Sequence, residues 1–316
     1  MHEEDIKFIS FLNNESPQNA HSRLYHYTTS AGFLGIFHKI PDGSPELWAS
    51  EIRYMNDNLE FFHGISIIQK QADKLLQNES DRIKIDILTG IINRIHTLSG
   101  PIFITSFCEE DDLLSQWRGY GGETGYSIGW DFQQLKSASY TGNWMLARCI
   151  YDQEKQNEAA MSYLRYHITD WVDYRIKDNP GLEALSEFYF GFVLRRFIPL
   201  LKHQSFSEEK EWRLISPWPV ESEGLSLDAF LDEKNFASAE RLAMQSQHIF
   251  YRPGRSGIIP YVNFKVQNEH AIYPVSIRIG PNNFMEMSVQ AMRLLLSSKG
   301  FPDTCKIDTS GSPFRI

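Results

Sequence analysis

The chain has 316 residues, of which 42% are hydrophobic and 22% charged, and its formal net charge is −9. This length allows one large domain or two small ones, with a sizeable core. The negative charge argues against broad electrostatic capture of nucleic acid or of an anionic membrane, although a local basic groove stays open. The N-terminus does not read as a signal peptide, and no apolar run approaches the roughly 20 residues of a membrane span. We therefore expect a cytoplasmic protein.

The first half of the chain predicts short strands interspersed with helices. Strands are expected at 24–28, 46–50 and 54–61, and a short helix at 32–37. Apolar residues at three- and four-residue spacing predict an amphipathic helical hairpin over 65–98, broken near 77–81. β-Branched and aromatic residues then predict a buried strand at 101–108, followed by a helical turn, a glycine-rich loop and a strand at 125–130.

The second half continues the mixture without a regular βαβ period. The expected elements, in order, are a strand at 144–152, helices over 154–203 interrupted at 177–181, a strand at 209–218, strands at 248–266 and 273–281, a helix at 284–298 and a strand at 304–310. This irregular order favours an α+β fold. We expect a single α+β domain over residues 1–316, with helical insertions at about 65–98 and 154–203.

The first segment with candidate functional residues is "LYHYTT", residues 24–29. On a strand, His26 shares one face with Leu24 and Thr28, while Tyr25 and Tyr27 lie on the opposite face. A lone histidine on a strand is more often a half-buried residue satisfied by a backbone carbonyl than a functional group. Both interpretations stay open at this point, and Tyr25 and Tyr27 are expected to pack the sheet.

The second segment is "SQWRGYGGETGYSIGWD", residues 115–131. Tyr120 and Tyr126 bracket its glycines, and Arg118 precedes them. Such aromatics can sandwich a planar ring while the guanidinium meets a phosphate. The spacing matches neither a dinucleotide fingerprint nor a P-loop. An ordinary hairpin loop whose aromatics pack the sheet edge explains the segment equally well.

The third segment is "SEEKEWRLI", residues 207–215. On a strand, Glu209, Glu211 and Arg213 share one face. Burying charges costs several kcal/mol unless they are paired, so a solvated edge with an Arg–Glu pair is the usual explanation. Trp212 and Leu214 instead indicate a core strand, which favours a functional reason for the charges.

Two further groups of residues are weaker candidates for a functional site. Glu60 and His63 form an ExxH pair, but further metal ligands are not evident, and the three separated cysteines offer no zinc cluster. We therefore predict no metal site. Arg252 and Arg255 flank a glycine turn, where they either grip a phosphate or form a surface loop.

Taken in order, the motifs "LYHYTT", "ASEIRYMND", "SQWRGYGGETGYSIGWD", "EKEWRLI" and "RIGP" resemble the pattern of the bacterial family DUF2971. The resemblance runs from about residue 24 to the C-terminus. The order of strand histidine, aromatic block and late-strand glutamate is also similar to the ADP-ribosyltransferase fold in its His–Tyr–Glu version. That second resemblance implies a split β-sheet core with helical insertions and NAD as the substrate.

Carried over residue by residue, the resemblance assigns His26 to a ribose hydroxyl and to the nicotinamide end of NAD. Tyr120 or Tyr126 would stack on the nicotinamide, and Glu211 would be the catalytic carboxylate. Glu209 would complete a pair of glutamates. The remaining residues that the resemblance places against NAD are Tyr27, Thr28, Arg118 and Arg213. Many such enzymes have glycine where this chain has Tyr27, which would narrow the space for NAD.

The resulting expectation is an enzyme that transfers ADP-ribose from NAD to a protein or nucleic acid, in a bacterial toxin or in phage defence. One alternative is a nucleotide- or RNA-end-binding module, or a 2′-phosphotransferase-like enzyme, in which Arg118, Arg213, Arg252 and Arg255 converge. Another is a non-catalytic interaction protein. The sequence leaves the acceptor and the oligomeric state open.

Overall fold

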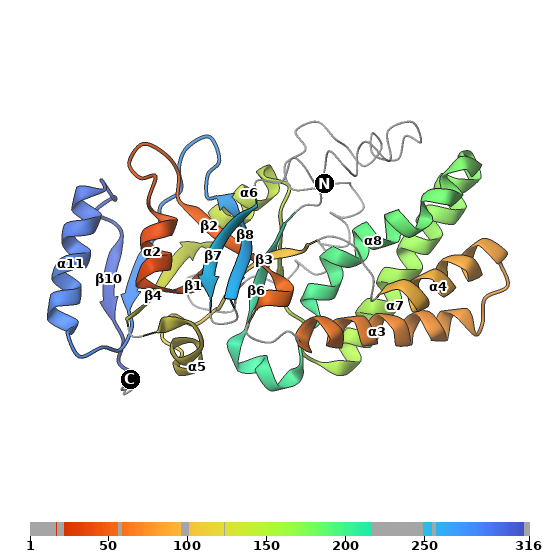
Figure 1. Ribbon diagram of the computed structural model, residues 1–316, viewed down its shortest axis with the longest axis horizontal. Coiled ribbons are helices and arrows are strands. Elements are labelled where there is room, and N and C mark those ends of the chain that lie inside the picture. The colour runs from red at the N-terminus through yellow and green to blue at the C-terminus, as the bar shows by residue number, and fades with distance from the viewer. Residues whose placement is uncertain are drawn as a thin grey trace.

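A computed structural model describes residues 17, 22–55, 59–95, 101–122, 124–216, 249–254 and 257–312. Figure 1 shows long helices gathered at one end of the molecule, β-strands in the middle, and helix α11 (Met285–Ser298) at the other end. The described part of the chain therefore combines helices and strands, as the α+β interpretation requires.

The larger sheet contains six strands. Their order is β5 (Met145–Arg148), β6 (Trp212–Ile215), β3 (Phe103–Phe107), β2 (Glu46–Glu51), β8 (Gly257–Lys265) and β7 (Phe250–Gly254). All neighbouring pairs are antiparallel. In the β3–β6 pair, Ser106 lies opposite Arg213 and Phe107 opposite Trp212. This register places the "EKEWRLI" segment beside the centre of the sheet.

The smaller sheet contains four strands in the order β1 (Arg23–Thr29), β4 (Gly125–Asp131), β9 (Ser276–Ile279) and β10 (Lys306–Thr309). The β1–β4 and β4–β9 pairs are antiparallel, whereas β10 runs parallel to β9. β1 carries "LYHYTT" and β4 carries the end of the aromatic block. Two of the three segments singled out above are thus neighbours in one sheet.

The two sheets meet at the end of β3. Cys108 forms an isolated antiparallel bridge with Tyr25, with backbone N–H···O distances of 2.9 and 2.8 Å. Helix α2 (Ser30–Ile36) follows β1 and packs closely against β2. The contact is so close that a Cβ built on Gly35 would lie only 2.1 Å from the Trp48 ring. The structure thus consists of two open sheets joined by one bridge; an ADP-ribosyltransferase-like architecture remains a prediction.

The predicted helical regions are confirmed. The hairpin consists of α3 (Leu59–Leu76) and α4 (Arg82–Arg94), and the Asp81 side chain caps α4 by accepting from two backbone N–H groups. The second region contains α7 (Gln153–Thr169) and α8 (Ser186–Phe197), with a 3₁₀ turn at Pro180–Leu185 where the interruption was expected. The Trp171 and Tyr189 rings stack at 4.2 Å inside this bundle.

Two large hydrophobic cores, together with a small cluster around Trp117, hold the described elements together. One lies between the larger sheet and the helices and includes Ile104, Ile215 and Trp171. The other lies between the two sheets and includes Trp130 and Trp212. Alternate residues of β3 and β6 contribute to the two cores, so the larger sheet is covered on both faces here.

Two expectations about local structure require correction. The strand expected at 54–61 is wrong at both ends: a 3₁₀ turn occupies Ile52–Tyr54 and α3 begins at Leu59, since Phe61 and Ile65 lie four residues apart on the buried face of a helix, while residues 56–58 lie outside the described part. The sequence reading also missed α6 (Phe132–Thr141), which the Asp131 side chain caps.

Candidate functional site

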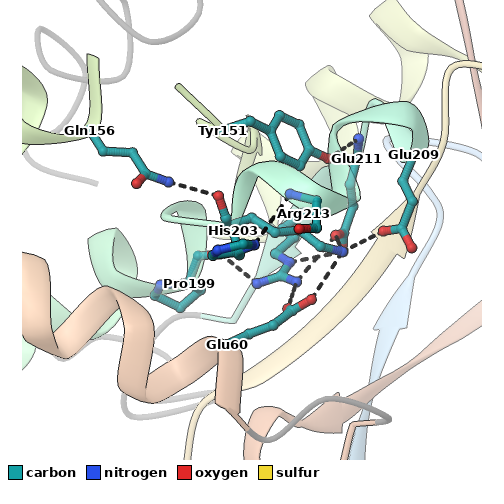
Figure 2. A network of polar contacts seen from close by, with 10 residues as sticks. Glu60, Tyr151, Gln156, Pro199, His203, Glu209, Glu211 and Arg213 are labelled. Carbon is teal, nitrogen blue, oxygen red and sulfur yellow. Dashed lines mark hydrogen bonds and ion pairs between the residues drawn. The ribbon is translucent and has the colours of Figure 1, made fainter. Parts of the chain in front are cut away.

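Five charged residues meet beside the first turn of α3, and we call them the charge cluster: Glu60, Lys202, Glu209, Glu211 and Arg213. Figure 2 shows the labelled members pointing toward one another from separate elements. Glu60 comes from α3, Lys202 follows a 3₁₀ turn at Ile198–Leu200, and Arg213 lies on β6. The polypeptide therefore brings together charges that are up to 153 residues apart in the sequence.

Lys202 occupies the centre of the charge cluster. Its ammonium group forms ion pairs with the carboxylates of Glu209 and Glu211, and it lies 3.2 Å from Oε1 of Glu60. Only 3% of the Lys202 side chain is exposed. Although burial alone would lower the pKa of Lys202, the carboxylate of Glu211 and then that of Glu60 raise it. The lysine is thus held in its charged form.

Arg213 binds the same carboxylates from the sheet side. Its Nε donates to Oε1 of Glu211 at 2.8 Å, and its Nη2 donates to Oε2 of Glu60 at 2.5 Å. Nη1 donates to the carbonyl of Pro199 at 2.6 Å. This guanidinium is fully buried and engaged on all three nitrogens, which is the arrangement that makes a buried ion pair tolerable.

The two glutamates of the "EKE" motif have different environments. For Glu211, burial favours the neutral form, but Arg213 and Lys202 outweigh it and lower the pKa to about 2. For Glu209, burial raises the pKa, and Lys202 offsets this only in part. Glu209 is also more exposed, at 15% of its side chain against 6% for Glu211. Glu211 is an anchored anion, whereas Glu209 has one cationic partner and a path to solvent.

The position of Glu209 corrects the expectation that it shares a strand face with Glu211. It ends a 3₁₀ turn at Gln204–Glu209, and β6 begins only at Trp212. Between them, Lys210 adopts a left-handed conformation with φ of 42°, which no extended strand contains. Both carboxylates nevertheless reach Lys202, because the turn folds Glu209 back toward it.

Tyr120 lies within electrostatic range of the charge cluster. It belongs to a π-helical turn at Trp117–Gly121, which follows α5 (Leu114–Gln116). Burial raises the pKa of Tyr120, and the negative charges of Glu211 and Glu209 raise it further. Of the two predicted stacking tyrosines, this one is placed near the carboxylates. Tyr126 instead packs on Phe33 of α2, with ring centroids 4.9 Å apart.

His26 lies on the other side of β3. Its Nδ1 is 3.0 Å from the carbonyl oxygen of Ser106. Because a carbonyl only accepts, Nδ1 carries the proton, and Nε2 is left with a lone pair. Burial lowers the pKa of His26, and the nearby charge of Arg252 lowers it further. The neutral ring therefore offers a hydrogen-bond acceptor at neutral pH.

Three residues complete what we call the histidine group: Ser106, which binds His26, Arg252, whose charge acts on it, and Ser50, which binds Arg252. Arg252 donates from Nη2 to the Ser50 hydroxyl at 2.9 Å. Within the described residues, the buried Nε of Arg252 and the buried hydroxyl of Ser106 have no hydrogen-bond partner. Such groups are rare in folded proteins and leave capacity for a ligand or for water.

Ser106 connects the two groups. Its carbonyl contacts His26 from β1, and its partner in the β3–β6 ladder is Arg213 of the charge cluster. The structure thus brings His26 of β1 and Arg213 of β6 to the same residue of β3. The sequence alone gave no reason to name Ser106.

Tyr27 and Thr28 have structural contacts. The Tyr27 hydroxyl donates to the carbonyl of Glu110 at 2.8 Å and accepts from the backbone of Leu113 at 2.9 Å, and its ring packs edge-on against Trp117 at 4.7 Å. Thr28 lies against α2, where a Cβ on Gly32 would come within 2.1 Å of its hydroxyl.

The remaining predicted residues are less informative. Arg118 is exposed on the π-helical turn, and Arg255 lies outside the described residues. Within the described part of the chain, no cluster of histidine, cysteine and acidic side chains is arranged to hold a metal ion. None of the described helices is long and apolar enough to cross a membrane.

Sequence reasoning missed Lys202, and it named Glu60 only as part of a metal motif. The available signal was indirect: two glutamates beside Trp212 on a buried strand require more positive charge than one arginine supplies. That requirement does not identify which lysine of the chain fulfils it.

Comparison with known families gives one match, which spans residues 116–214 and belongs to a family described as "Protein of unknown function (DUF2971)". Neither the curated proteins nor the solved structures contain a match to the chain. The matched segment runs from the π-helical turn to β6 and includes Tyr120, Lys202 and Glu211, but it includes neither His26 nor Glu60. The chain is therefore similar to this family over the segment that carries most of the charge cluster.

Proposed function

We propose that this chain is an ADP-ribosyltransferase-like protein, which binds NAD beside β3 and transfers ADP-ribose to a protein or nucleic acid. The observation that carries the proposal is the position of Ser106, between His26 on one side and Arg213 of the charge cluster on the other. The histidine of β1 and the charged segment that leads into β6 thereby approach the same residue of β3.

Within the proposal, the histidine group binds the ribose and a phosphate. Nε2 of His26 accepts a hydrogen bond from a ribose hydroxyl, which suits a neutral ring whose Nδ1–H is already donated to a carbonyl. The unpartnered Nε–H of Arg252 is available to a phosphate oxygen. Tyr120, near the carboxylates, is the better candidate of the two tyrosines for stacking on the nicotinamide.

Within the proposal, the two glutamates have different roles. Glu211 is held by two cations and positions Lys202 and Arg213. Glu209, with one cationic partner and the larger exposed fraction, is the carboxylate that can approach a substrate. We assign Glu209 to the anomeric centre, where a carboxylate stabilises the positive charge of an oxocarbenium-like transition state.

In the reaction, the bond between the nicotinamide nitrogen and the ribose breaks, and its electron pair leaves with the nicotinamide. A nucleophilic atom of the acceptor forms the new bond to the same carbon and loses its proton to the carboxylate or to water. Catalysis in this reaction comes from the orientation of the substrates and from electrostatic stabilisation. The proposed mechanism therefore needs no covalent intermediate with a side chain of this chain.

The test is an incubation of the full chain with NAD that carries a label in its adenylate half, together with a cell lysate, followed by measurement of released nicotinamide and of label on macromolecules. Glu209→Gln is expected to lower the rate by about 100-fold or more, in line with the loss of other preorganised electrostatic groups. The matched control is Glu208→Gln, because Glu208 is an exposed neighbour outside the charge cluster.

Two results would reject the proposal. The first is a wild-type chain that neither binds NAD nor releases nicotinamide. The second is a slow nicotinamide release that Glu209→Gln, Glu211→Gln and His26→Ala all leave unchanged.

One observation favours a second candidate, a non-catalytic interaction protein. The members of the charge cluster bind one another so completely that the cluster also serves as a means of joining α3 to the sheet. Under this alternative, Glu209→Gln changes stability and leaves nicotinamide release at the level of a blank.

The phosphotransferase-like alternative gains less support. Arg213 already donates from all three of its nitrogens to two carboxylates and a carbonyl, so its guanidinium is committed to the charge cluster. Arg252 belongs to a different group, with Ser50 as its partner. A nucleotide-binding role in the absence of transfer would appear as NAD binding without nicotinamide release.

A further inference from the structure

Helix α11 carries a row of exposed apolar side chains on its outward face. Phe284, Met287 and Leu294 are 69%, 68% and 73% exposed, which places them among the most exposed large apolar residues of the described chain. Ala291 is exposed as well. Phe284 immediately precedes the helix, and the spacings of three, four and three residues continue from it through Met287 and Ala291 to Leu294, so the row follows one side of α11.

The opposite face of α11 is used inside the fold. Met292 and Leu296 are buried and belong to the core between the two sheets. Figure 1 shows α11 at the end of the molecule, beyond β10. The stripe is thus a second apolar face on a helix that already packs into the fold through its first. Single apolar residues scattered over a surface are common, but a regular row along one helix is not.

The exposed polar residues beside the stripe identify what fits it. Glu286 and Arg293 are both exposed on the same side of the stripe, and within the described residues no ion pair involves either of them. Their midpoint falls between residues 289 and 290, and the midpoint of the stripe falls at residue 289. The charge pattern and the apolar pattern share one centre.

We propose that α11 is a homodimerisation surface, on which a second copy of this chain docks its own α11 in antiparallel orientation. A two-fold axis beside residues 289–290 places Phe284 opposite Leu294 of the other copy and Met287 opposite Ala291. The same axis places Glu286 opposite Arg293, and it does so twice, so the interface satisfies the self-complementarity that two-fold pairs require. Gln290 lies next to the axis, where two glutamine side chains bond each other readily.

The helix also sets the strength of the contact. Its 14 residues are about 21 Å long. A pair of such helices covers less than the roughly 1,200–2,000 Å² of a standard stable interface. The dimer is therefore reversible, and its formation depends on protein concentration. This inference does not rest on the proposed function, because α11 is remote from β3 in the fold.

Sedimentation velocity of the full chain between about 1 and 300 µM tests the proposal. We expect a monomer–dimer equilibrium in that range. The double variant Met287→Glu, Leu294→Glu is expected to raise the dissociation constant at least about 30-fold, because it places four carboxylates in an apolar contact. Tyr140→Glu is the matched control, since Tyr140 is 61% exposed on α6; it leaves the equilibrium unchanged.

A charge exchange tests the orientation. Glu286→Arg alone and Arg293→Glu alone are each expected to weaken the dimer about 5- to 10-fold at low salt, and the two changes together to restore it. A parallel pair would place Glu286 beside Glu286 and would show no such restoration. A chain that stays monomeric throughout, a dimer that Met287→Glu with Leu294→Glu leaves intact, or a failed restoration would each overturn the proposal.

Discussion

The charge cluster and the histidine group lie on two sides of the same strand, yet they use their polar atoms differently. In the charge cluster, three carboxylates and two cations bind one another, and Arg213 is engaged on every nitrogen. In the histidine group, Nε of Arg252 and the hydroxyl of Ser106 have no hydrogen-bond partner among the described residues. One group is complete in itself, whereas the other has unused hydrogen-bonding capacity.

This difference indicates that the charge cluster stabilises the fold, whereas the histidine group is suited to bind a ligand. A buried charge network that lacks one member leaves uncompensated charge and is strongly destabilising. A half-buried group with a free acceptor contributes less to stability and more to recognition. We therefore expect changes in the charge cluster, apart from those at Glu209, to act mainly on folding, and changes in the histidine group to act mainly on binding.

Removal of the central cation is expected to have the largest effect. Lys202→Met leaves three glutamates near one arginine, so the free energy of unfolding should fall by about 3–5 kcal/mol. Urea unfolding followed by circular dichroism measures it. A loss below about 1 kcal/mol would show that the charge cluster does not hold α3 to the sheet.

Acid should weaken the charge cluster next. The pKa of Glu211 is about 2 in the folded chain, below its ordinary value of 4.5. Its stabilisation is therefore complete above pH 4.5 and is lost as the pH falls from 4.5 toward 2. Thermal unfolding across this range should show a steep loss for the wild type and a shallower one for Glu211→Gln. Equal slopes would contradict the ion pairs.

A smaller effect is expected at His26. Its pKa in the fold lies below the ordinary 6.5, so the unfolded chain binds the proton first as the pH falls. The neutral ring then stabilises the fold above pH 6.5, and this contribution declines below it, at about 1.4 kcal/mol per unit of pKa difference. His26→Gln should remove the pH dependence between 7 and 5. If the free energy of unfolding of His26→Gln still changes with pH in this range, a group other than His26 causes the dependence.

The smallest effect is expected at Lys210, which pairs with Glu110 outside the charge cluster. Its ammonium lies 2.7 Å from Glu110, but the two side chains are 43% and 47% exposed. Solvent screens such a pair, so Lys210→Gln should change the free energy of unfolding by less than about 1 kcal/mol. A loss as large as that of Lys202→Met would mean that charge alone, and not burial, determines the response.

Much of the fold followed from local patterns. The strands β1, β3 and β4 were predicted from their aromatic and β-branched residues, and the helical hairpin from its apolar spacing. The failures have local causes too. The stretch 54–61 begins with Tyr54 and ends with Phe61, aromatic residues that favour strands, although the helical periodicity of α3 prevails at Phe61.

The candidate site was less predictable, because its contacts are long-range. The Glu60–Arg213 and Lys202–Glu60 pairs join elements that no local pattern links. The unpartnered Nε of Arg252 depends on the pairing of β7 with β8 and of β8 with β2, which a single sequence does not specify. Side-chain types indicated that charge would need compensation, but only the fold identified the partners.

Calorimetric titration of the full chain with NAD tests the central claim most directly, namely that the histidine group meets the ligand while the charge cluster holds the fold. We predict that the wild type binds NAD, and that Arg252→Gln weakens binding about tenfold or more while unfolding within about 1 kcal/mol of the wild type. Absence of NAD binding, or equal binding by Arg252→Gln, would contradict the account.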